Sequence, residues 1–196
     1  MRNRSIRTMA IALTAVSALL ASAEAQTPIS PAYIEKATGI SFPVRIGLLA
    51  FEGVEEYDDV RYGVAIKYSA IGVAGTLYIY DSGLKTVPPG VENPIHKDAL
   101  DMAVNDIKEV SRQGQYQDVV FSREEIADLA GSGTGQRARH VSLTYTFDGT
   151  GWHSHIFVLG YKNQILKLRF SYVDGLKTTG EEQLRVLTKW LNDATK

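Results

Sequence analysis

The chain contains no cysteine among its 196 residues. Disulfide bridges, thiolate nucleophiles and cysteine-ligated metal centres are therefore excluded. The protein must be held together by burial of apolar surface and by hydrogen bonding. Without its first 25 residues the chain keeps 171 residues, which is enough for one domain to bury a core without covalent bridges.

Clusters of positive charge are also missing beyond the first few residues. The first 25 residues contain three of the 21 basic and one of the 22 acidic residues, so the remainder has a net charge of −3. Interspersed charges of this kind do not favour the counterion release that drives nucleic-acid binding, so we expect no nucleic-acid partner. No later apolar run reaches the roughly 17 residues of a membrane helix, so we expect no transmembrane segment in the mature chain.

The amino terminus has the pattern of an export signal. Three arginines within the first seven residues precede an apolar run over residues 9–20 and a small-residue segment over residues 21–25. We expect cleavage between Ala25 and Gln26. The sequence thus predicts a signal peptide over residues 1–25 and a single α+β domain over residues 26–196, which would be periplasmic or secreted.

Alternation of apolar and polar side chains predicts two antiparallel β-meanders. The strands of the first are expected near residues 44–54, 60–69 and 73–80. The second fills residues 137–172, with turns expected at residues 148–151 and 161–163. The first meander holds four tyrosines, which suit half-buried strands and can also line a cleft, with the proline-rich segment 85–92 as its lip.

Two longer helices follow from capping residues and helical spacing. Asn93 and Pro94 supply an N-cap and a first helical residue, and apolar residues continue at helical spacing until Gly114. A second helix is expected to begin at Thr178 or Thr179 and to close the chain. The predicted fold is an antiparallel sheet packed with a central and a C-terminal helix. Shorter elements are expected as a helix over residues 31–39, a strand over residues 119–121 and a helix over residues 122–130.

His153 and His155 are the most distinct candidates for a ligand-binding site. Residues two apart on a strand point to the same face, so both imidazoles can address one ligand. Pairing Phe147 with Trp152 across the first turn keeps the apolar faces together, and it places Thr144 opposite His155.

The second turn determines which charge lies beside the histidines. If residues 161–163 form that turn, Arg169 lies beside His155, and the group can hold a small carboxylate or phosphate. A metal site that adds Asp148 is an alternative, although the fixed charge of Arg169 opposes it. The third interpretation, which we favour, is a solvated polar face without a ligand.

No cluster of catalytic residues is visible, and no cofactor is indicated. The chain has no Gly-x-Ser-x-Gly segment, and Ser154 falls on the apolar side of its strand. Its adjacent carboxylates resemble turn or cap residues rather than an acid–base pair that spans a substrate. The sequence favours a non-enzymatic protein, with an uncharacterised hydrolase as the remaining enzymatic alternative.

The order of elements, together with the stretches Gly-Tyr-Lys-Asn at 160–163 and Leu-Lys-Leu-Arg-Phe at 166–170, resembles the Mog1/PsbP-like group. This group includes exported PsbP-type and DcrB-type accessory proteins, and the resemblance covers most of residues 40–195. It implies an α/β/α sandwich and a non-catalytic role in binding or assembly, without identifying functional residues. A cystatin-like or other α+β fold is the alternative. We therefore expect an exported accessory or binding protein of the bacterial envelope, whose partner is an envelope protein or a small ligand.

Overall fold

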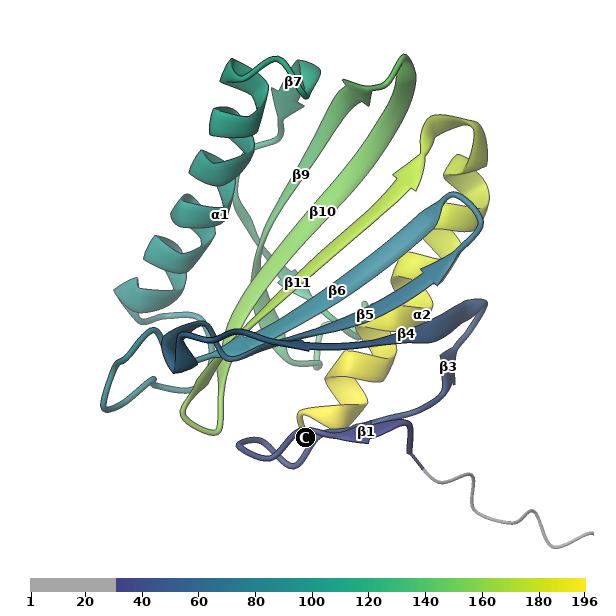
Figure 1. Ribbon diagram of the computed structural model, residues 1–196. Coiled ribbons are helices and arrows are strands. Elements are labelled where there is room, and N and C mark those ends of the chain that lie inside the picture. Colours follow the sequence, from purple (N-terminus) through teal and green to yellow (C-terminus); the bar gives the residue numbers. More distant parts are fainter. Residues whose placement is uncertain (1–30) are drawn as a thin grey trace, which may run out of the picture.

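The computed structural model describes residues 31–196, so the predicted signal peptide and cleavage site lie outside the described residues. Within this part, one antiparallel sheet carries most of the strands, and two long helices pack against it (Figure 1). The predicted α+β class is confirmed. Neither helix of residues 31–196 combines the length and apolar character needed to cross a membrane.

The two predicted meanders are present and join at the centre of the sheet. Strands β4 to β6 form the first and β9 to β11 the second, and β6 pairs with β11. The order across the sheet is β3-β4-β5-β6-β11-β10-β9-β7, with β8 also on β9. The strands are β3 Arg45–Ile46, β4 Leu49–Glu56, β5 Val64–Ala70, β6 Val73–Tyr80, β7 Gln117–Phe121, β8 Glu125–Asp128, β9 Arg137–Phe147, β10 Thr150–Tyr161 and β11 Gln164–Val173.

The helices lie on opposite faces of this sheet. Helix α1, Pro94–Arg112, begins as predicted, because Asn93 Oδ1 accepts a hydrogen bond from the amide of Ile95. It packs mainly on β9 and β10 and shares their apolar core. Helix α2, Lys177–Ala194, lies against β11 and places Leu187 and Leu191 in the other core (Figure 1). Both faces of the sheet are therefore partly covered.

Two short predicted helices are wrong. Residues 125–128 form β8, which pairs with residues 137–140 of β9, so the local capping pattern at Ser122 is overridden by strand pairing. Residues 33–34 form β1, Tyr33–Ile34, paired with β2, Ser41–Phe42. The turn between them is held by the Glu35 carboxylate, which accepts from the amides of Ala37 and Thr38.

Both hairpin turns of the second meander are shorter than predicted. Asp148 and Gly149, at φ 48° and 70°, form a two-residue turn that pairs Phe147 with Thr150, and the register therefore moves by two residues. Lys162 and Asn163, at φ 44° and 64°, form the next two-residue turn. Here the register moves by one residue, which exchanges the two faces of β11 relative to the histidines.

Candidate ligand-binding sites

The corrected register separates Arg169 from the histidines. His155 pairs with Phe170 on β11, whereas Arg169 pairs with Ile156 and lies on the α1 side of the sheet. Thr144 pairs with His153 rather than with His155. The predicted row of Thr144, His155 and Arg169 is therefore wrong as a group. The prediction that His153 and His155 share a face is correct, since both stack near the ring of Tyr172.

A hydrogen-bonded chain of side chains replaces the predicted row. His140 Nδ1 lies 2.9 Å from Glu125 Oε1, and His140 Nε2 lies 3.1 Å from His155 Nδ1. Because the carboxylate only accepts, a neutral His140 donates to Glu125 from Nδ1 and accepts from His155 Nδ1–H. We call Glu125, His140, His155 and His153 the histidine row.

The charge state of the histidine row does not suit anion binding. Burial, and then repulsion from His140 and His153, lower the pKa of His155 to about 4, so this imidazole is neutral at pH 7. His153 is itself paired with Asp174, at 2.7 Å. Within residues 31–196, no three histidine or acidic side chains are arranged to hold a metal ion. His153 and His155 line a hollow of about 340 Å³ with Ser142 and Thr144, and ligand binding there stays a prediction.

A different hollow opens on the α1 side, where Arg169 lies. Helix α1 covers β9 and β10, but β6 and the adjoining face of β11 extend beyond it (Figure 1). Three adjoining hollows of about 380, 250 and 300 Å³ share Tyr78 and form what we call the tyrosine groove. Its wall on α1 includes the small residues Ala99 and Ala103. Its remaining lining consists chiefly of Tyr57, Tyr62, Tyr78, Tyr80, Met102, Asp106, Tyr116, Tyr145, Trp152, Lys167 and Arg169.

Two cations lie on the floor of this groove. Lys167 and Arg169 alternate with buried apolar residues of β11, so both point to the α1 side and both are half-buried. Lys167 Nζ lies 4.3 Å from the ring centroid of Tyr78, and Arg169 Nη2 donates to Tyr116 Oη at 3.3 Å. Among residues 31–196, no carboxylate lies within 4.0 Å of either cation.

The pKa of Lys167 shows that its position on the groove floor disfavours the charged form of this side chain. Burial lowers the pKa of the Lys167 ammonium, against the opposing effect of Asp106, and the charge of Arg169 lowers it further. Burial and then the Asp106 carboxylate raise the pKa of Tyr80 to about 12, so this phenol is neutral. The groove thus contains two cations, one carboxylate at its rim and a wall of uncharged tyrosines.

Aromatic side chains close the other end of the groove. The rings of Tyr116 and Tyr145 have centroids 4.3 Å apart, and Tyr145 stacks on Trp152 at 6.4 Å. The indole Nε1 of Trp152 is buried and has no hydrogen-bond partner in the described residues. Aromatic walls beside fixed charges are typical of sites for small organic ligands.

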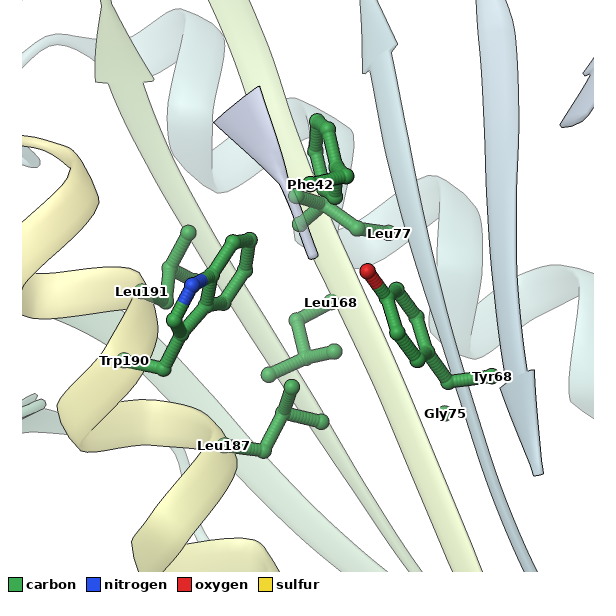
Figure 2. Close-up of a pocket in the computed structure, with 8 residues that line it drawn as sticks. All are labelled: Phe42, Tyr68, Gly75, Leu77, Leu168, Leu187, Trp190 and Leu191. Carbon is green, nitrogen blue, oxygen red and sulfur yellow. The ribbon is translucent and has the colours of Figure 1, made fainter. Parts of the chain in front are cut away.

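The apolar cavity on the α2 side is too small for a ligand. Figure 2 shows it enclosed by Phe42, Tyr68, Gly75, Leu77, Leu168, Leu187, Trp190 and Leu191. Its volume of about 10 Å³ is near that of a single water molecule, and its lining is almost wholly apolar. This cavity is a packing defect of the core between α2 and the sheet.

The proline-rich loop does not form the predicted lip. Val87 and Val91 are buried, and the amide of Val87 donates to Asn163 Oδ1 at 2.8 Å. Gly90 and Gly160 exchange two backbone hydrogen bonds of 2.9 and 2.7 Å. The loop is therefore fastened to the end of the β10–β11 hairpin. None of residues 85–92 lines the groove, although Ser82, which precedes them, does.

Comparison with family models and with curated sequences adds no relative. No model of a known protein family matches the chain, and no curated protein matches its sequence. The function must therefore be argued from the site. Sequence reasoning missed Lys167 and Arg169 as a pair, although a Lys-x-Arg segment between buried strand residues was a detectable signal.

Proposed function

We propose that this protein is an exported, non-enzymatic binding protein of the bacterial envelope, and that the tyrosine groove takes a small organic anion. One observation carries the choice of site: Lys167 and Arg169 are half-buried on the groove floor with no carboxylate within 4.0 Å in the described residues. The predicted signal peptide supports the assignment to the envelope.

Half-buried cations that lack a neighbouring opposite charge lower the stability of a protein. Burial of an unpaired charge is unfavourable, and an opposite charge with good hydrogen bonding offsets that cost. A carboxylate or phosphate in the groove would accept from Lys167 and from the planar guanidinium of Arg169. The tyrosines would contact the organic part of the same molecule.

The resemblance to the Mog1/PsbP-like group supports a binding role rather than catalysis. An antiparallel sheet with one helix on each face is the arrangement that the resemblance implies. A hydrolase is less well supported, because Ser154 is fully buried and its Oγ lies 2.8 Å from Ser171 Oγ. An accessory role, in which an envelope protein is the partner, is the second candidate.

Tryptophan fluorescence offers a direct test. The chain has two tryptophans, and only Trp152 lines the groove, since Trp190 lies on the α2 side. In Trp190→Phe protein, the emission of Trp152 should change on titration with benzoate, hexanoate or inorganic phosphate. Lys167→Met and Arg169→Met should each weaken binding of the anion that responds by about 10-fold or more, as expected for loss of a charged hydrogen bond.

Lys67→Met is the matched control. Lys67 lies on the same face of the sheet on β5, separated from β11 by β6, but it is exposed and paired with Glu55 at 2.6 Å. This variant should bind like the parent protein. Lys167→Met should also unfold at the same or a higher temperature than the parent, because it removes a half-buried unpaired charge. Equal affinity of all three variants, or no response to any of the anions, would contradict the proposed site.

A further inference from the structure

The position of Asp106 indicates which class of anion the groove binds. This inference rests on the proposed function. Asp106 lies on the α1 wall and lines two of the three hollows together with Lys167. It acts on Lys167 and Tyr80 electrostatically, yet its carboxylate lies more than 4.0 Å from any cation of residues 31–196. A space of about 250 Å³ adjoins the two cations and this carboxylate.

We propose that the tyrosine groove selects monocarboxylates with an apolar body and that Asp106 is the residue that rejects dianions. The carboxylate of the ligand lies between Lys167 and Arg169. Its apolar body lies in the neighbouring hollow, against Tyr80 and Met102.

The charges of the groove support a single negative charge on the ligand. Lys167 and Arg169 contribute two positive charges and Asp106 one negative charge, so one carboxylate neutralises the site. Positions two apart on a strand are separated by about 6.5–7 Å, which allows one anionic group to accept from both long side chains. A second carboxylate would have to lie near Asp106 or among the tyrosines, where repulsion or lost hydration would oppose it.

The shape of the groove places the apolar body. The hollow beyond Lys167 has a volume of about 380 Å³, at the small end of ligand pockets. Its lining is mainly apolar and aromatic, and it includes Met102 and Tyr62, whose exposed fractions are 61% and 56%. These large apolar side chains at the mouth would lose contact with water when an acyl chain or an aryl ring is bound.

Hexanoate and adipate form a matched pair for the test, because both contain six carbons and differ in one carboxylate. Calorimetric titration of the mature protein should give a Kd for hexanoate at least 10-fold lower than that for adipate. Asp106→Asn should reduce the ratio of the Kd for adipate to the Kd for hexanoate by about 3- to 10-fold, which is the effect of one partly solvated charge at close range. Asp98→Asn is the control, because Asp98 is exposed on the same helix and does not line the groove.

The outcomes separate the two proposals. Equal or tighter binding of adipate by the parent protein would overturn the selection of monocarboxylates, and an unchanged preference in Asp106→Asn would overturn the role of Asp106. Either result would leave an anion site at Lys167. Binding of hexanoate that Lys167→Met does not weaken would overturn the proposed site itself. A lack of binding of both hexanoate and adipate would overturn the proposed selectivity, whereas binding of phosphate alone would retain an anion site without it.

Discussion

Stability of this protein should depend on pH through His155. The pKa of this imidazole is lowered from 6.5 to about 4 in the folded protein, mainly because it is buried among aromatic rings. Between these two values the unfolded chain binds a proton that the folded protein does not. The free energy of unfolding therefore falls as the pH is lowered from 6.5 toward 4, and the contribution of His155 is fully present above pH 6.5.

The size of the effect follows from the two pKa values. One pKa unit corresponds to about 1.4 kcal/mol, so the gap between 6.5 and about 4 amounts to about 3 kcal/mol. This is a large part of the 5–15 kcal/mol, roughly, that stabilises an ordinary domain. His155→Phe should remove this pH dependence, and a phenyl ring can occupy the same stack between His140 and Tyr172.

Urea denaturation of both proteins at several pH values from 4 to 8 measures the difference. The parent protein should lose about 3 kcal/mol more than His155→Phe over this interval. Parallel curves for the two proteins would refute the reasoning. A titration of the His155 ring followed by NMR gives an independent check, and a midpoint near 6.5 would place this imidazole in water rather than in the histidine row.

Two further substitutions test close packing and turn geometry. Gly180→Ala should destabilise the protein by about 1–3 kcal/mol in thermal denaturation, although alanine favours helices, because a Cβ there would collide with the Tyr172 ring. Gly175→Ala, with open space at the same atom, is the control and should change the stability little. Asn163→Ala should cost about 1–2 kcal/mol, since Asn163 has a φ of 64° and accepts from the amide of Val87; an unchanged melting temperature would contradict this.

Local sequence patterns predicted most of the elements correctly. The correct predictions rest on signals between residues that are close in the sequence, so they can be recognised without knowledge of the fold. These signals are the capping residue Asn93, the alternation within both meanders and the apolar spacing of the C-terminal helix. The pattern at Ser122 shows the limit of such signals. It is compatible with a helix cap, but β9 offers residues 125–128 a partner for backbone hydrogen bonds, and strand pairing prevails.

The composition of the predicted site depends on the register between β10 and β11, and an error of one residue in that register changes it. That His153 and His155 share a face follows from the period of a strand, and the sequence alone determined it. Whether Arg169 joins them depends on the number of residues in the turn at Lys162 and Asn163, and a change of one moves every side chain of β11 to the other face.

The tyrosine groove is a property of the tertiary structure. The tyrosines of the groove and its two cations lie in separate segments of the chain, but no local pattern predicts that β6 pairs with β11. Nor does any local pattern say that α1 will cover β9 and β10 and stop short of these residues. The face of a strand to which a side chain points depends only on the backbone of that strand, so a short stretch of sequence determines it. Whether a charged side chain is exposed depends on which distant elements of the chain pack over it, so only the tertiary structure decides it.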